Sequence, residues 1–214
     1  MFKFLKELFN SNSSASPNLI EQRKPEATPT QNPEEFVCHT FLPYNVTIIF
    51  IHTANKNKRN ICFMSLMIVE NSTIKYKSFY IKPNTKSFSM LDYNGLSLDT
   101  IMSAPTLSEI WASILPYITD KNIAVYYAPF QLESLQKALE YNHIEFPNMK
   151  SFTDLYDITT KLWPRLTSHS LDNIGDKFGL SYNPKDVSTG QNICNELLEY
   201  IFDHRPKLLN YLTK

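Results

Sequence analysis

Glycine and cysteine are scarce in this chain of 214 residues, and neither sign of charge prevails. The four glycines are scattered, which argues against a phosphate-cradling loop or a dinucleotide-binding fingerprint. The three cysteines (Cys38, Cys62 and Cys194) lie far apart without a CxxC pair, so the sequence does not indicate a disulfide framework. Cys62 and Cys194 fall in apolar patterns typical of buried thiols, and we expect a reducing, cytoplasmic setting.

Long apolar runs are also missing from the sequence. No run approaches the roughly 20 residues that a helix needs to cross a bilayer, so no transmembrane segment is expected. Lysine and arginine together number 21, as do aspartate and glutamate, which leaves no net charge to draw the whole chain toward nucleic acid or an anionic membrane. This balance is still compatible with a local basic groove.

Residues 1–35 are predicted to form a disordered N-terminal arm ahead of a folded domain over residues 36–214. Met1–Phe9 has the composition of a short amphipathic helix, but isolated helices of this length are marginal in water. A frayed terminus is therefore the favoured interpretation, and a segment that docks on a membrane surface or a protein partner is the alternative. Asn10–Glu35 is rich in polar residues and buries too little apolar surface to offset its ordering entropy.

Two apolar runs organise the folded part. Val46–Thr53 and Ile61–Val69 are apolar at almost every position, as expected for strands buried on both faces of a sheet. Thr73–Lys82 then alternates between faces, which predicts a third strand nearer the sheet edge, so that the three runs form an antiparallel meander. A fourth strand is predicted at Asn122–Tyr127, and a short extended piece begins at Phe152.

Capping residues predict helices between and after these strands. The expected starts and ends are a capping box of Thr106 with Glu109, a Pro129 at the first position of a helix, an N-cap at Asp154, a stop at Gly179, and a last long helix over about Ser188–Phe202. Antiparallel strands followed by alternating helices and strands predict an α/β domain, with a mixed sheet and helices on both of its faces.

Further landmarks follow the strands in a fixed order. They are Asn94-Gly95 followed by Leu-Ser, Ala104–Thr106 ahead of Trp111, and Leu162–Pro164. In this order and spacing, the chain from about residue 44 to 202 resembles the DnaQ-like family of DEDDh, proofreading-type 3′-5′ exonucleases. The resemblance implies a ribonuclease H-like fold. It also implies an active site in which four carboxylates hold two Mg²⁺ or Mn²⁺ ions and a histidine acts as base.

The five positions that match the family's catalytic residues hold other residues. Where the first strand of the family carries Asp and Glu, this chain has Phe50 and His52. Gln131 replaces the Asp of the second motif, and Lys185 and Gly190 replace the His and Asp of the third. Because Mg²⁺ and Mn²⁺ prefer hard oxygen ligands, we expect no catalytic residue, no metal ligand and no cofactor.

The candidate binding residues are Phe50, His52, Tyr126, Tyr127 and Lys185. The three aromatic residues are interpreted as packing that fills the former acidic site, and a stacking platform for single-stranded bases is the alternative. His52 is interpreted as an ordinary hydrogen-bonded residue rather than a metal ligand. Lys185 is interpreted as a solvated side chain rather than a phosphate ligand.

The sequence therefore predicts a pseudoenzyme, an exonuclease-like domain that serves as a binding or scaffold module, with a protein partner bound through the N-terminal arm. The alternative is a domain that binds single-stranded nucleic acid or a nucleotide without cutting it. An active 3′-5′ exonuclease with a relocated site is the third interpretation. Fold and function are separate claims, because one fold hosts many functions.

Overall fold

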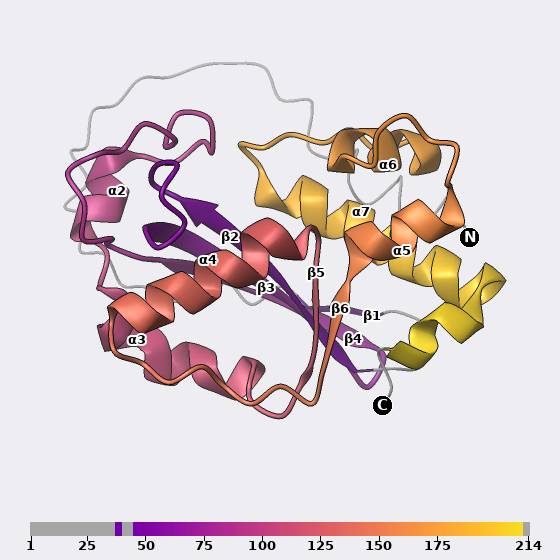
Figure 1. Ribbon diagram of the computed structural model, residues 1–214, viewed down its shortest axis with the longest axis horizontal. Helices are drawn as coiled ribbons and strands as arrows, with labels where there is room; N and C mark the ends of the chain where they lie inside the picture. The colour runs from indigo at the N-terminus through magenta and orange to yellow at the C-terminus, as the bar shows by residue number, and fades with distance from the viewer. Residues whose placement is uncertain (1–36, 40–44, 212–214) are drawn as a thin grey trace, which may run out of the picture. The chain divides into compact units, whose positions relative to one another are not determined.

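A six-stranded mixed sheet organises residues 37–39 and 45–211, the part of the chain that this computed structural model describes (Figure 1). In spatial order the strands are β1-β4-β3-β2-β5-β6. Their bounds are Val37–His39 for β1, Val46–Thr53 for β2, Ile61–Glu70 for β3, Thr73–Tyr80 for β4, Asn122–Val125 for β5 and Ser151–Asp154 for β6. The strands from β1 to β2 pair antiparallel, whereas β5 runs parallel to both β2 and β6. The arm predicted for residues 1–35 lies outside the described residues.

Helices connect the strands and cover the sheet. The α-helices are α2 (Leu98–Ser103), α3 (Leu107–Ile114), α4 (Ala128–Tyr141), α5 (Leu155–Leu162), α6 (Leu171–Phe178) and α7 (Val187–His204), and the 3-10 helices are η1 (Leu115–Tyr117) and η2 (Pro206–Tyr211). Within the described part of the chain, no helix combines the length and the apolar character needed to cross a bilayer.

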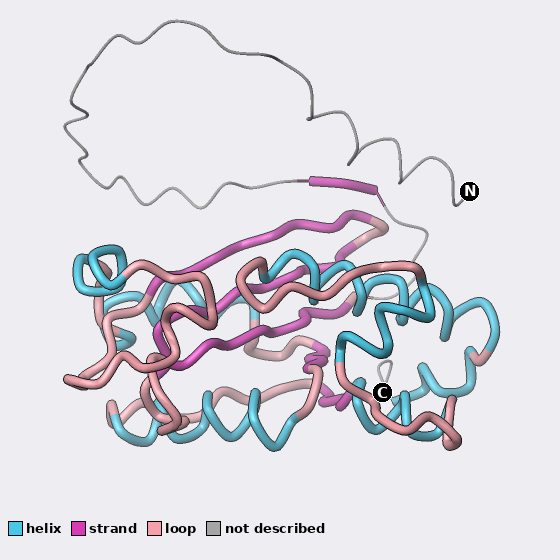
Figure 2. The backbone as a smooth tube through the Cα atoms, turned by 90° about the horizontal axis from the view of Figure 1, so that it is seen from above, coloured by secondary structure: helices cyan, strands magenta, loops and turns pink. Residues whose placement is uncertain are grey.

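Strand β2 is central because its side chains alternate between two cores. Ile48 and Phe50 face the core that α5, α6 and α7 cover. Ile49 and Ile51 face the other core, which α3 and α4 cover. The strands form one layer between these helices (magenta in Figure 2), so the predicted α/β architecture with helices on both faces is confirmed.

Several predicted helix ends are confirmed at the level of single groups. The backbone N–H and the hydroxyl of Thr106 both donate to Glu109 Oε2, at 2.7 and 2.8 Å. The carboxylate of Asp154 accepts from Tyr156 N at 2.9 Å and caps α5. Gly179, with a φ of 68°, ends α6 in the left-handed conformation that favours glycine.

Two predicted strand ends are wrong, and one strand was missed. The third predicted strand ends at Tyr80 rather than at Lys82. The fourth ends at Val125 rather than Tyr127, because Tyr127 adopts a φ of 71° and turns the chain into α4. Strand β1 was not predicted, since a three-residue strand is too short to show a period; it pairs with β4.

Candidate functional site at the carboxyl end of strand β2

The residues that the resemblance assigns to catalysis come from three elements. Phe50 and His52 lie near the end of β2, Gln131 lies in the first turn of α4, and Lys185 and Gly190 flank the start of α7. Figure 1 shows how β2, α4 and α7 are arranged. We call Phe50, Gln131 and Gly190 together the Phe50 centre.

Phe50 and Gly190 fit one another. The Phe50 side chain is only 4% exposed and belongs to the core under α7. A Cβ atom added to Gly190 would lie 3.0 Å from Phe50 Cε1, closer than packed carbon atoms normally approach. The ring therefore fills the space between β2 and α7 that a side chain at position 190 would need.

Gln131 acts as a substitute for a missing strand partner. Its Oε1 accepts a hydrogen bond from Ile51 N at 2.6 Å. The pairing of β5 with β2 ends where Val125 lies opposite Ile49, so the Ile51 N–H lies beyond the end of β5. A buried backbone N–H without a partner would be costly, and the Gln131 amide removes that cost.

His52 is held by packing rather than by the hydrogen bond that the sequence suggested. Its Nδ1 atom is buried and has no hydrogen-bond partner. Burial lowers the pKa of the imidazole from 6.5 to about 4, so the ring is neutral at pH 7. The ring centroid lies 5.6 Å from that of Phe63, the residue opposite it on β3.

Tyr126 and Tyr127 have different surroundings, although the sequence treats them alike. Tyr126 is 5% exposed, its hydroxyl donates to His169 O at 2.5 Å, and burial raises the pKa of the phenol. Tyr127 is 47% exposed, with its ring edge-on to Tyr156 at 5.3 Å between centroids. The packing interpretation therefore describes Phe50 and Tyr126, whereas the ring of Tyr127 is open to solvent.

Lys185 has an exposed side chain and a tightly packed backbone. A Cβ atom at Gly95, whose φ is 67°, would lie 2.8 Å from both the Cβ and the carbonyl oxygen of Lys185. Only glycine allows the Asn94-Gly95 loop to approach so closely. The loop therefore lies against the chain just before α7.

Two further residues support the site: Gln191 was not predicted from the sequence, and Asp154 was predicted only as the N-cap of a helix. Gln191 is 2% exposed and donates through Nε2 to Ser65 Oγ at 2.8 Å. Ser65 is the residue of β3 that lies opposite Phe50 of β2. Asp154 accepts from Tyr127 N at 3.0 Å and from Ala128 N at 2.8 Å, in addition to capping α5. The polar Gln191 on the apolar face of α7 was the available sign of a buried polar contact.

The side chains of the Phe50 centre do not fit a pair of divalent ions. Mg²⁺ requires hard oxygen ligands, and here it would meet the apolar ring of Phe50 and a Gln131 amide oxygen that the backbone already occupies. Among the residues that the structure describes, no three or more His, Cys, Asp or Glu side chains gather where they could hold a metal ion.

The architecture is shared with known exonuclease domains. The nuclease domain of 3′hExo, a DEDDh family member bound to rAMP, matches with a TM-score of 0.62 and 13% identity over 75% of this chain and 92% of that chain. Cell-death related nuclease 4 (CRN-4) matches with a TM-score of 0.61 and 14% identity over 75% and 64%. E. coli exonuclease I in complex with a dT13 oligonucleotide matches with a TM-score of 0.64 and 13% identity, over 78% of this chain but 43% of that chain.

The chain thus has the ribonuclease H-like fold of these exonuclease domains, while it spans less than half of E. coli exonuclease I. No protein-family model matches the sequence, and no curated protein matches it significantly. At identities this low the likeness concerns the fold, and function has to be argued from the site.

Proposed function

We propose that this domain is a pseudoenzyme, an exonuclease-like module that binds a partner without hydrolysing nucleic acid. The observation that carries the proposal is the packing of Phe50 against Gly190. The resemblance expects carboxylates at positions 50 and 190. This chain has an aromatic ring at position 50 and no side chain at position 190, and the ring occupies the space between the two positions.

Two-metal hydrolysis needs charge where this centre has none. The ions must be held by acidic side chains so that they activate a water molecule and stabilise the leaving oxygen. Here Gln131 is neutral and bonded to β2, and His52 is neutral and packed against Phe63. The absence of a metal cofactor is part of the proposal and follows from these residues.

Two kinds of partner are compatible with a module that does not cut. A protein scaffold is the first, and binding of such a partner through residues 1–35 stays a prediction. Single-stranded nucleic acid is the second, and two observations favour it. Tyr127 offers an exposed ring beside the centre, and similar folds occur with bound rAMP in 3′hExo and with dT13 in exonuclease I.

The direct test is a nuclease assay on the full chain. Purified protein would be incubated with 3′-labelled single-stranded DNA and RNA in the presence of Mg²⁺ or Mn²⁺, and Mn²⁺ binding would be measured by calorimetry. We expect no release of nucleotides from the 3′ end and no Mn²⁺ binding at the Phe50 centre.

A contaminating nuclease is the main confounder of this assay, so a variant must accompany it. Gln131→Ala removes the contact of the Phe50 centre with β2 and should disturb any reaction that takes place there. Metal-dependent release that co-elutes with the protein and falls in this variant would overturn the proposal. Release that does not co-elute with the protein would be assigned to a contaminant.

A further inference from the structure

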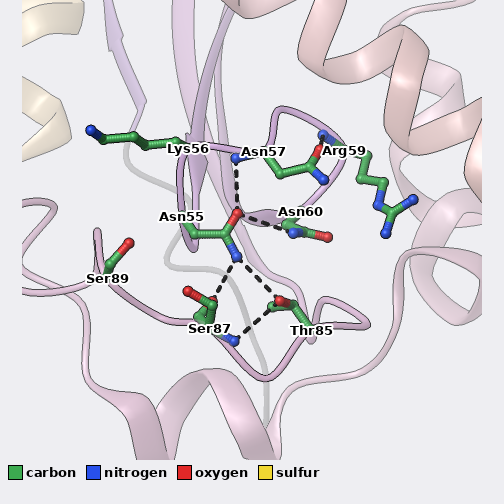
Figure 3. A pocket seen from close by; sticks show the side chains of 8 residues that line it. All are labelled: Asn55, Lys56, Asn57, Arg59, Asn60, Thr85, Ser87 and Ser89. Atoms are coloured by element: carbon green, nitrogen blue, oxygen red, sulfur yellow. Dashed lines mark hydrogen bonds between the residues drawn. The ribbon is translucent and has the colours of Figure 1, made fainter.

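Two loops at the carboxyl end of β2 form an open polar pocket (Figure 3). One loop joins β2 to β3, and the other follows β4. We call this feature the Asn55 pocket; its lining residues are Asn55, Lys56, Asn57, Arg59, Asn60, Thr85, Ser87 and Ser89. Its volume of about 420 Å³ lies within the range of small-ligand sites, roughly 300–1,000 Å³.

Asn55 joins the two loops and fixes the shape of the pocket. Its side chain is buried, and its Nδ2 donates to Thr85 Oγ1 at 3.2 Å and to Ser87 O at 2.7 Å. Its Oδ1 accepts from Asn57 N at 2.9 Å and from Asn60 Nδ2 at 3.1 Å. The amide is thus fully used for structure, and ligand contacts would come from the other lining side chains.

The lining has the chemistry of an anion site. Its eight residues include two cations, Lys56 and Arg59, and no carboxylate, and the others are amides and hydroxyls. Both cations are exposed. Lys58 lies between them in the chain but is engaged elsewhere, because it pairs with Glu133 and donates to Pro129 O.

The positions of the cations favour an extended anion over a small one. In Figure 3, Lys56 and Arg59 extend to opposite sides of the Asn55 amide. A chain with charges at regular spacing can contact both cations with separate phosphates.

An exposed aromatic ring beside the pocket favours nucleic acid over an acidic protein segment. The guanidinium of Arg59 lies 4.5 Å from the ring centroid of Tyr141, which is 38% exposed. The Tyr141 hydroxyl accepts from Asn84 Nδ2 at 2.8 Å, which holds the ring next to the loop that follows β4. Cations along the backbone and an aromatic surface for bases are the combination that binds single strands.

We propose that the Asn55 pocket binds the backbone phosphates of a single-stranded nucleic acid, with Lys56 and Arg59 each neutralising a phosphate. The exposed part of the Tyr141 ring, beyond the face that Arg59 covers, offers a stacking surface. The site uses no residue of the Phe50 centre. A failure to bind oligonucleotides at the Asn55 pocket would therefore not contradict the proposed lack of hydrolysis. Likewise, nuclease activity would not contradict binding at the Asn55 pocket.

The test compares two variants of the full chain with the same change in charge. Lys56→Gln with Arg59→Gln removes both cations of the pocket. Lys150→Gln with Arg205→Gln removes an exposed lysine and an exposed arginine outside it. Binding of labelled oligothymidylate and oligouridylate, each about 12 nucleotides long, would be followed by fluorescence anisotropy over a series of salt concentrations.

The pocket variant should bind about tenfold more weakly near 0.15 M salt, and the slope of log K against log salt should fall by about 1.4, since each phosphate contact on a single strand contributes ~0.7. The control variant should bind like the wild type. The single variant Lys56→Gln should show about half of this change in slope. It provides a second test if the double variant folds poorly.

Several results would overturn the proposal. These are an equal loss in the control variant, no binding of either oligonucleotide by the wild type, or calorimetric binding of inorganic phosphate without binding of oligonucleotides. Poly-glutamate of matched charge serves as the acidic-protein arm. If it bound as tightly as the oligonucleotides and was equally weakened in the pocket variant, the site would be one for acidic proteins.

Discussion

The Phe50 centre and the Asn55 pocket lie at the same end of β2 and are only a few residues apart in the chain, yet they are built on opposite plans. In the Phe50 centre a buried ring fills the space, and the Gln131 amide is used to complete a strand. In the Asn55 pocket a single buried amide holds two loops, and the cations around it face solvent.

The difference follows from what each region packs against. Position 50 faces α7, so it must hold an apolar side chain unless bound metal ions compensate a charge there. The residues after Thr53 leave the sheet and enter a loop, where water can solvate charged groups. At one end of a sheet, the site on the strand can therefore be filled by a buried side chain while the adjoining loops stay exposed to solvent.

The largest expected effect would come from restoring the carboxylate that the resemblance assigns to position 50. Phe50→Asp should lower the free energy of unfolding by at least about 3 kcal/mol at pH 7, because an ionised group would be buried without a partner. Urea denaturation measures the change, with Phe50→Leu as the apolar control, which leaves only a small cavity and is expected to cost about 1–2 kcal/mol. Equal stability of Phe50→Asp and the wild type would mean that the centre is open.

A smaller loss of stability is expected from a substitution in the Asn55 pocket. Asn55→Ala should cost about 2–3 kcal/mol, because the buried amide of Asn60 and the part-buried groups of the Thr85–Ser87 loop lose their partner. Asn57→Ala, at an exposed position of the same loop, should stay within about 0.5 kcal/mol of the wild type.

The same pair of asparagine variants tests whether the shape of the pocket matters for binding. Asn55→Ala should weaken oligonucleotide binding although both cations remain, because both loops lose their connection. Its loss should exceed that of Asn57→Ala, which removes only one of the polar lining side chains. If the two variants were equally stable and bound equally well, Asn55 would not organise the pocket.

The sequence was most informative where local patterns determine the structure. The apolar runs at Val46–Thr53 and Ile61–Val69 predict strands with both faces buried, and β2 and β3 are such strands. Asp154 and Gly179 mark helix ends because capping depends on a few neighbouring groups. The resemblance placed Phe50 and Gly190 at matching positions, but their mutual fit depends on how α7 crosses β2.

The parts that the sequence could not predict depend on contacts between distant segments. The role of Gln131 arises because β5 stops opposite Ile49, which no local pattern shows. The Asn55 pocket exists because one amide reaches a loop some 30 residues further along the chain. Tyr126 and Tyr127 are adjacent tyrosines that the sequence does not distinguish. Their surroundings differ because Tyr127 takes a left-handed conformation at the start of α4.

His52 lies between the two regions and offers the smallest expected effect. Its pKa is about 4 in the folded protein against 6.5 when exposed, so the unfolded chain binds a proton between these pH values that the folded protein does not. The stability that His52 contributes is therefore complete above pH 6.5 and is lost as the pH falls toward 4. Between pH 7 and pH 5 the loss should be about 2 kcal/mol.

Denaturation of the wild type, His52→Gln and His143→Gln at pH 7 and pH 5 would measure this contribution. His143→Gln, at an exposed position, is the matched control for replacing a histidine, and His52→Gln should lose about 2 kcal/mol of the pH dependence of the wild type. If His52→Gln kept the full dependence, the imidazole would be solvated. His52 would then belong with the solvent-exposed residues of the Asn55 pocket, and the buried region would end at Phe50.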